Sequence, residues 1–335
     1  MTARPLALTM GDPAGIGPEI IAAAWRQLAD GGTDPALVVC GDPAVMAAHA
    51  PVHLLSGPQA LGAPCPADRL CVLDTGRCTV PVVAGRPDPA HAPAILGAIR
   101  SAVDLALAGQ VRGIVTAPIA KEPLYRAGFT SPGHTEFLGE LTAHAPVSGP
   151  RGPVMMLAGG DLRVALATVH APLARVPGLL DTGGLIGLGR LVHHALVRDF
   201  GIPRPRIVVA GLNPHAGEGG SIGTEEATII APAVAALAAE GLDVRGPASA
   251  DTLFHPEARA THDAVICMYH DQGLIPLKML AFWSGVNVTL GLPVVRTSPD
   301  HGTGFDIAGR GLARADSMRA AIALADRIAA QRGLV

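Results

Sequence analysis

The sequence predicts a two-domain α/β fold in which helices cover both faces of a mostly parallel sheet. Apolar stretches of strand length alternate along the chain with longer, helix-like segments, and such alternation is typical of parallel sheets with right-handed crossovers. A length of 335 residues corresponds to about two domains of ordinary size. Hydrophobic residues make up 49% and charged residues 16% of the chain, which indicates a well-packed globular enzyme.

The first third of the chain shows the alternation most clearly. We expect strands over Leu6 to Met10, Ala36 to Cys40 and Gly113 to Thr116, and helices from Pro18 onward and over Ala94 to Ala108. Residues 57 to 93 are rich in Pro, Gly and Ala and predict loops with short strands. The chain is expected to end on a helix over Ser317 to Arg332, with Ser317 as its N-cap.

Charge and hydropathy exclude several classes of protein. The net charge of -3 is close to neutral and no basic stripe is present, so we expect no nucleic-acid partner. The start, Met1 to Pro5, lacks the apolar stretch of a signal peptide, and no segment approaches 18 uninterrupted apolar residues. We therefore expect a cytoplasmic protein with no membrane partner.

The five cysteines are Cys40, Cys65, Cys71, Cys78 and Cys267. They form no C-x-x-C pair and their number is odd, which argues against both a disulfide framework and a thiolate metal site. We expect them to be small buried hydrophobic residues.

Three histidines follow apolar, strand-like runs. His170 closes the run from Leu162, His215 follows the run Arg206 to Ala210, and His270 closes the run from Asp263. Parallel strands place their carboxyl ends at one edge of the sheet, where open α/β proteins build their sites. Three imidazoles at one edge, with carboxylates nearby, are suited to a divalent cation.

Two glycine-rich segments are candidates for ligand loops. The first strand runs into Gly11 to Glu19, where glycines allow a tight turn and Pro18 can open a helix; a ligand loop and a plain turn remain equally open. The segment Gly211 to Gly220 combines Asn213, His215 and Glu218 with several glycines. Such a combination favours a loop that approaches a ligand over a structural turn.

Further polar residues suggest an anion site. Gly133 to Glu136 follows a Pro/Gly turn and can open a helix toward an anion, or can be an ordinary N-terminus. Lys278, Asn287 and Arg296 lie in apolar surroundings, where a charge needs a partner. Phosphate or carboxylate suits both Lys and Arg, and an internal salt bridge is the alternative.

Several motifs together resemble the 4-hydroxythreonine-4-phosphate dehydrogenase family of pyridoxal phosphate biosynthesis. The resemblance runs from Thr9 to Gly311. It is carried by Gly11 to Glu19, Gly133 to Phe137, Gly211 to Gly220, Ala250 to Phe254, Tyr269 to Gly273 and Val288 to Pro293.

The resemblance implies a role for particular residues. A divalent metal, Zn, Mg or Co, would be held by His170, His215 and His270. Substrate contacts would come from His134, Thr135, Lys278, Asn287 and Arg296. The segment from Asp300 is similar to the nicotinamide loop of isocitrate and isopropylmalate dehydrogenases, which implies that NAD or NADP contacts His301, Gly302 and Thr303.

The resemblance also implies a reaction. The enzyme would oxidise 4-phosphooxy-threonine with NAD(P) to 2-amino-3-oxo-4-phosphooxybutanoate, which decarboxylates to 3-amino-2-oxopropyl phosphate. Candidates for the general base are Asp251, Asp271 and Lys278. Three alternatives stay open: a dehydrogenase of erythronate or threonate 4-phosphate, a nicotinamide-independent, metal-dependent aldolase or hydrolase, and a non-catalytic sugar-phosphate binding protein.

The resemblance extends to fold and assembly. An isocitrate/isopropylmalate dehydrogenase-like fold is expected, with residues 1–130 plus 290–335 forming a nucleotide-side domain and 131–289 a domain for metal, substrate and dimer contacts. The active site is expected in the cleft between them. The resemblance further implies a homodimer with shared active sites; which histidine crosses the interface is open, and His270 is the trial choice.

Overall fold

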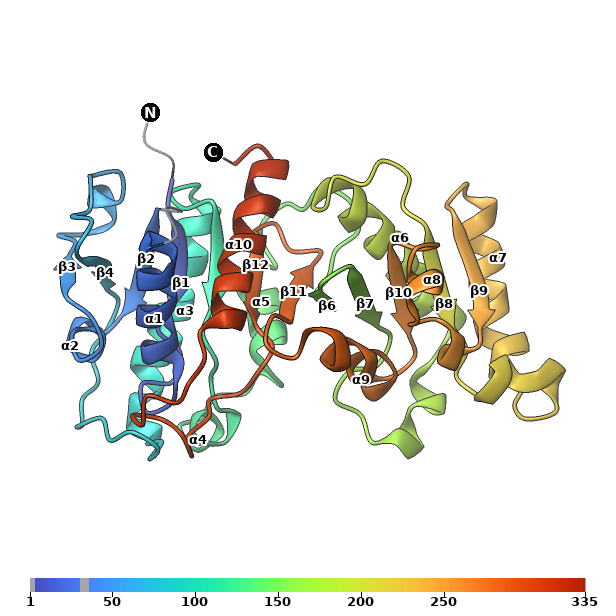
Figure 1. Cartoon of the computed structure of the whole chain (residues 1–335), viewed down its shortest axis with the longest axis horizontal. Coiled ribbons are helices and arrows are strands. Elements are labelled where there is room, and N and C mark those ends of the chain that lie inside the picture. Colours follow the sequence, from blue (N-terminus) through green and yellow to red (C-terminus); the bar gives the residue numbers. More distant parts are fainter. Residues whose placement is uncertain (1–3, 31–35, 335) are drawn as a thin grey trace. The chain divides into compact units, whose positions relative to one another are not determined.

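The computed structural model describes residues 4–30 and 36–334 (Figure 1). The chain forms two compact α/β units. Unit 1 comprises residues 1–146 and 292–335, and unit 2 comprises residues 147–291. The divisions expected from the sequence were 130/131 and 289/290. Residues 131–146 belong with unit 1 because Phe137 and Leu138 are buried in its core.

The described residues of unit 1 form six parallel strands in the order β3-β4-β2-β1-β5-β12. The strands are β1 (Leu6–Thr9), β2 (Leu37–Gly41), β3 (Val52–Leu54), β4 (Leu70–Asp74), β5 (Gly113–Thr116) and β12 (Arg296–Pro299). The helices are α1 (Gly17–Asp30), α2 (Pro43–Ala47), α3 (Ala92–Leu107), α4 (Lys121–Arg126), α5 (His134–Leu141) and α10 (Asp316–Gln331).

Helices cover both faces of the unit 1 strands. Ala7, Val38, Cys40 and Ile114 are buried in the core cluster that contains α3, and the residues between them point to the opposite face. There α10 packs against α1 and β12 (Figure 1). The expected strands and the helices α3 and α10 are therefore confirmed, because their apolar residues repeat at the period of the element that they form.

Unit 2 contains strands in the order β11-β6-β7-β10-β8-β9. These are β6 (Val154–Gly159), β7 (Leu162–Leu166), β8 (Ile207–Ala210), β9 (Val244–Ala248), β10 (Ala264–Cys267) and β11 (Val286–Leu290). The helices are α6 (Thr182–Arg198), α7 (Ala231–Ala239), α8 (Pro256–Arg259) and α9 (His270–Ala281). β6 is antiparallel to β7 and β11, whereas β7, β10, β8 and β9 are parallel. The expectation of a mostly parallel α/β fold is confirmed.

The expected cap at Ser317 is wrong. Helix α10 begins at Asp316, its N-cap residue is Ala315, and no side chain caps it. Ser317 is instead buried within the first turn, where its Oγ atom accepts a hydrogen bond of 3.1 Å from the Asp300 backbone N–H. The serine thus satisfies a backbone group that follows β12.

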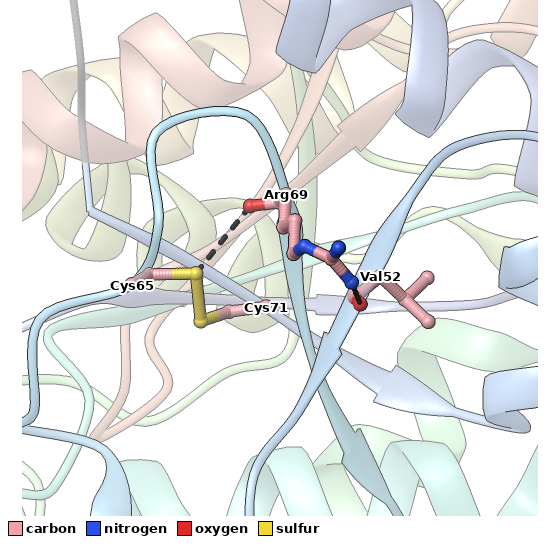
Figure 2. Close-up of a disulfide and its surroundings, with 4 residues drawn as sticks. All are labelled: Val52, Cys65, Arg69 and Cys71. Atoms are coloured by element: carbon pink, nitrogen blue, oxygen red, sulfur yellow. Dashed lines mark hydrogen bonds between the residues drawn. A yellow bond between two sulfur atoms is a disulfide. The ribbon is translucent and has the colours of Figure 1, made fainter.

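The expectation that all five cysteines are unpaired is also wrong. Cys65 and Cys71 form a disulfide with their Cα atoms 6.2 Å apart (Figure 2). The residues before β4 turn back on themselves, so that a spacing of six residues falls within disulfide range. The Arg69 guanidinium beside the bridge donates a hydrogen bond of 3.4 Å to the Val52 carbonyl (Figure 2). Cys40 and Cys267 are buried, as expected.

No helix among the described residues is long and apolar enough to cross a membrane.

Candidate active site

The strands that precede the three candidate histidines are neighbours in unit 2. β10 lies between β7 and β8 and is parallel to both. Cys267 pairs with Leu166, and Ile266 pairs with Val209, so the three carboxyl ends lie at one edge. The expected convergence of the strand ends is thereby confirmed: the segments carrying the three histidines start from the same edge.

Two polar side chains tie these strand ends together. Thr168 Oγ1 donates a hydrogen bond of 2.8 Å to the Met268 carbonyl. Gln272 is buried; its Oε1 accepts from the Met268 N–H at 2.7 Å and its Nε2 donates to the Gly211 carbonyl at 2.7 Å. The segments that follow β7, β10 and β8 are therefore linked by side-chain hydrogen bonds.

His170 and His270 line one cavity of about 280 Å³ together with Tyr269 and Asp271. Their ring centroids are 5.9 Å apart. His270 is the first residue of α9, and its Nδ1 atom lies 2.6 Å from the Asp271 carboxylate. The two imidazoles thus share a cavity within one chain. This arrangement argues against the trial choice of His270 as the one histidine that crosses a dimer interface.

His215 lies on the segment Pro214–Gly220, where it is two-thirds exposed. Its Nδ1 atom lies 2.9 Å from the Glu218 carboxylate. Among residues 4–30 and 36–334, no three His, Cys, Asp or Glu side chains gather closely enough to hold a metal ion. The structure therefore brings His170 and His270 together but does not add His215 to the pair.

The donor chemistry nevertheless fits a divalent cation. In His215 and His270 a carboxylate engages Nδ1, and such a partner fixes the tautomer and leaves Nε2 as the metal-facing nitrogen. Imidazoles with such a partner are ligands that suit Zn. The residues present are thus compatible with the expected metal, although no complete coordination set is formed.

The remaining unit 2 candidates lie on separate elements. Asp251 follows β9, is exposed, and accepts a hydrogen bond of 2.6 Å from Ser249 Oγ. The Lys278 ammonium lies over the Phe282 ring at 5.5 Å from its centroid. Asn287 is in β11, and its Oδ1 atom is buried with no hydrogen-bond partner among the described residues. An amide oxygen of this kind is available to a donor that is not part of the chain.

Unit 1 contains a buried cation. Arg296 begins β12 beside β5 and is only 3% exposed. Its guanidinium donates a hydrogen bond of 2.7 Å to Thr116 Oγ1 at the end of β5. Burial lowers the pKa of Arg296 to about 10, while the nearby Glu136 carboxylate raises it. Arg296 is therefore still charged at neutral pH, and a bound anion would offset its loss of hydration.

The expected helix start at Gly133 to Glu136 is confirmed as the beginning of α5. His134 is its first residue, and burial, followed by the Arg296 charge, holds the pKa of His134 well below its usual value. The imidazole is neutral at pH 7, and its Nε2 atom is buried with no partner among the described residues. A Cβ atom at Gly133 would lie 3.1 Å from Lys121 Nζ, so glycine leaves room for this ammonium.

The structure also joins two motifs that the sequence keeps far apart. The backbone N–H of Ile16 donates to the Thr303 carbonyl at 2.8 Å. A Cβ atom at Gly15 would lie 2.7 Å from the same oxygen, so this close approach requires glycine. The Gly11 to Glu19 loop therefore supports the segment that carries Gly302 and His301, both of which are exposed.

Sequence reasoning missed four residues that organise these sites: Thr116, Lys121, Thr168 and Gln272. Thr116 and Thr168 end or follow apolar strands, and Gln272 follows His270 by two positions. A polar residue at the end of a buried strand was the available signal. The partners of these side chains are distant in sequence and could not be identified from it.

Comparison with known proteins gives a consistent result. Residues 33–325 match the family described as pyridoxal phosphate biosynthetic protein PdxA. The chain is 60% identical to the 4-hydroxythreonine-4-phosphate dehydrogenase of Caulobacter vibrioides, with 100% of both chains covered. The crystal structure of the Klebsiella pneumoniae enzyme of that name is 40% identical, covers 98% of each chain and gives a TM-score of 0.84.

A more distant structure shows the fold alone. Isocitrate dehydrogenase from Methylococcus capsulatus is 14% identical, with a TM-score of 0.50 over 99% of this chain and 87% of that chain. This agrees with the fold class expected from the sequence.

Proposed function

This chain belongs to the pyridoxal phosphate biosynthetic protein PdxA family, and from this membership we propose that it oxidises 4-phosphooxy-threonine with a nicotinamide cofactor. The C3 hydroxyl gives its proton to a base and the C3–H bond gives a hydride to NAD or NADP, which yields 2-amino-3-oxo-4-phosphooxybutanoate and the reduced cofactor. This β-keto acid then loses CO2 to give 3-amino-2-oxopropyl phosphate.

The buried Arg296 guanidinium carries the proposal in the structure. A cation that is 3% exposed and has a threonine hydroxyl as a hydrogen-bond partner is suited to a doubly charged phosphate. Neutral His134, the Thr135 hydroxyl and the first N–H groups of α5 can add hydrogen bonds to the same oxygens. We assign the phosphate to these groups, the anion set, and we assign further substrate contacts to Lys278 and Asn287.

Divalent metal belongs to the same proposal, with the histidine set His170, His215 and His270 as its ligands. Bound there, such a cation would lower the pKa of the substrate hydroxyl. Asp271 and Glu218 orient two of the imidazoles through their Nδ1 atoms. Because Asp271 is engaged in this way, we favour Asp251 or Lys278 as the group that accepts the hydroxyl proton.

We place the nicotinamide cofactor at His301, Gly302 and Thr303. The support for this assignment is that Thr303 is held by the glycine-rich loop at Gly15 and Ile16. A paired assay with NAD and NADP would define the preference between them.

A substrate test separates the alternatives. The purified protein should reduce nicotinamide with 4-phosphooxy-threonine and lose this activity on chelation. Faster turnover of erythronate or threonate 4-phosphate would instead favour the sugar-acid alternative. Product formation without a change at the reduced-nicotinamide absorbance band would identify an aldolase or hydrolase.

We also propose a homodimer with shared active sites. Support comes from α9 and the residues after it, where Ile275, Met279, Phe282 and Trp283 are exposed at helical spacing. Met279 is 84% exposed, and an apolar face of this size favours a second copy of the chain as its partner. Met279→Glu should shift the native mass spectrum from dimer to monomer.

Complementation would show which histidine the partner contributes. Two different histidine-to-alanine variants are mixed, and random reassortment of subunits makes about half of the dimers mixed. A mixed dimer has one intact site if the two histidines of a site come from different chains. Activity should then return to roughly a quarter of wild type. We expect no recovery for His170→Ala with His270→Ala, because these rings share one cavity. Recovery for that pair would assign one of the two rings to the partner.

A cytoplasmic location is the last part of this proposal. Reducing conditions there keep most thiols unpaired, so Cys65 and Cys71 should be reduced in growing cells and pair only on oxidation. Alkylation in intact cells followed by mass spectrometry would test this. A fully protected Cys65–Cys71 pair in vivo would argue for an oxidising compartment.

A further inference from the structure

The backbone that carries His215 is unusual for residues with side chains. Six consecutive residues, His215 to Gly220, have positive φ angles, and three of them, His215, Ala216 and Glu218, are not glycine. The left-handed region is unfavourable for such residues because Cβ approaches the carbonyl oxygen. A run of this kind persists only where the surrounding structure holds it.

Glu226 is the group that holds the residues just before this segment. Its Oε1 atom accepts hydrogen bonds from the backbone N–H groups of Leu212 at 2.8 Å and Asn213 at 2.7 Å. Its Oε2 atom accepts from Asn213 Nδ2 at 3.0 Å. Glu226 is only 5% exposed, so a buried carboxylate receives donors at both oxygens.

Two glycines let the backbone approach this carboxylate closely, and the carboxylate itself belongs to a helical turn. A Cβ atom at Gly217 would lie 2.7 Å from Glu226 Oε2, and one at Gly211 would lie 3.2 Å from Oε1. Glu226 also begins the π-helical turn Glu226–Ile230. Such turns are rare in proteins as a whole, and those that occur are frequently at functional sites. Directly after β8, the Gly211 carbonyl accepts from Gln272 of α9. The segment is thus held by two separate elements.

We propose that Glu226 is a positioning residue that holds the left-handed segment and thereby directs the His215 imidazole toward a divalent cation. This inference rests on the proposed function of His215. Both carboxylate oxygens act as acceptors, so a glutamine would place an NH₂ group opposite an N–H donor at one of them. The equally sized Glu226→Gln substitution removes the negative charge and one acceptor, and therefore disrupts the hold without creating a cavity.

The first test is titration of metal-free protein with Zn²⁺. We expect Glu226→Gln to bind Zn²⁺ about 10- to 100-fold more weakly than wild type, which is the range for lost partners of metal ligands. Glu225→Gln is the matched control: Glu225 also accepts from Asn213 Nδ2, at 2.8 Å, but not from the Leu212 and Asn213 backbone. The Glu225→Gln variant should bind Zn²⁺ with an affinity within about threefold of wild type, a smaller change than the loss of a metal ligand's partner causes. If Glu226→Gln does not fold, Glu226→Asp replaces it, because aspartate keeps both acceptors but is shorter.

A rescue distinguishes positioning from general destabilisation. Glycine adopts positive φ without the Cβ penalty, so Ala216→Gly should lower the strain that Glu226 opposes. Added to Glu226→Gln, it should recover at least about threefold in Zn²⁺ affinity, a part of the loss expected for a missing partner. Wild-type affinity in Glu226→Gln, or no rescue by Ala216→Gly, would overturn the proposal.

Failure of the proposed function is recognised separately. If wild type itself binds no divalent metal, the metal assignment is wrong, and amide hydrogen exchange of the metal-free protein decides the role of Glu226. Faster exchange over residues 211–217 in Glu226→Gln, but not in Glu225→Gln, would support the positioning role. Equal exchange in both variants would refute it.

Discussion

The anion set of unit 1 and the histidine set of unit 2 are built in opposite ways. Arg296 lies inside the sheet, 3% exposed, with Thr116 as its fixed partner. His170 and His215 lie on exposed segments that follow strands, and side chains such as Gln272 tie these segments together. The first set is preorganised for a charged ligand. The second set, as proposed, presents its imidazoles on tethered loops, and the described residues do not bring all three together.

Removal of metal should break this contrast most severely. Chelation should reduce turnover at least about a hundredfold, because loss of several kcal/mol of hydroxyl activation corresponds to that factor. Adding back Zn²⁺ or Co²⁺ should restore it, and circular dichroism should not change, since the large cores of both units do not depend on an ion. Full turnover by protein that elemental analysis shows to be metal-free would contradict the assignment.

The next largest effect is expected in unit 1. Arg296→Ala should cost about 2 to 4 kcal/mol of transition-state stabilisation, since it removes a buried charge partner. This loss is measured as the fall in kcat/KM for the phosphorylated substrate. The dephosphorylated analogue should lose much less. Arg310→Ala, at an exposed arginine of the same unit, is the control. Equal losses for both substrates would make Arg296 a structural residue.

The links within unit 2 should have a smaller, mainly structural effect. Gln272→Met removes the partners of the Met268 N–H and the Gly211 carbonyl. The free energy of unfolding should fall by about 1 to 3 kcal/mol, as for other buried groups left unsatisfied. Urea denaturation measures this fall, and an unchanged midpoint would show that the strand ends are held by packing alone.

The smallest expected effect is a pH dependence in unit 1. The pKa of His134 is lower in the folded protein than its usual value of 6.5, so the unfolded chain takes up the proton first as pH falls. Stability should therefore decrease below pH 6.5, by no more than about 2 kcal/mol between pH 7 and pH 5. His134→Asn should reduce this slope, measured by denaturant titration at each pH, with His301→Asn as the control. An equal slope in wild type and His134→Asn would contradict a buried, neutral imidazole.

Much of the framework follows from local patterns. The apolar periodicity predicted β1, β2, β5, α3 and α10, because each element buries residues at its own repeat. The same patterns predicted that the strands before His170, His215 and His270 share an edge. Register and partners of single polar groups were not predictable, since they depend on which strands become neighbours.

Three particular results show this limit. Arg296 meets Thr116 across 180 positions of sequence, and no local pattern specifies such a pair. Ser317 resembles a helix cap but is used by the Asp300 N–H. The Cys65–Cys71 bridge depends on a loop whose Pro- and Ala-rich sequence does not indicate where it turns back.

The division of unit 1 into two stretches of chain has a consequence for protein synthesis. Residues 147–291 form a complete unit, so they can fold on the ribosome while the first 146 residues still lack β12 and α10. Domains generally fold as units during synthesis, at about 5 to 20 residues per second. The edge of β5 that pairs with β12 therefore stays uncovered until Arg296–Pro299 has emerged. Arg296 arrives with β12, so the proposed anion set is completed only after all of unit 2 has been synthesised.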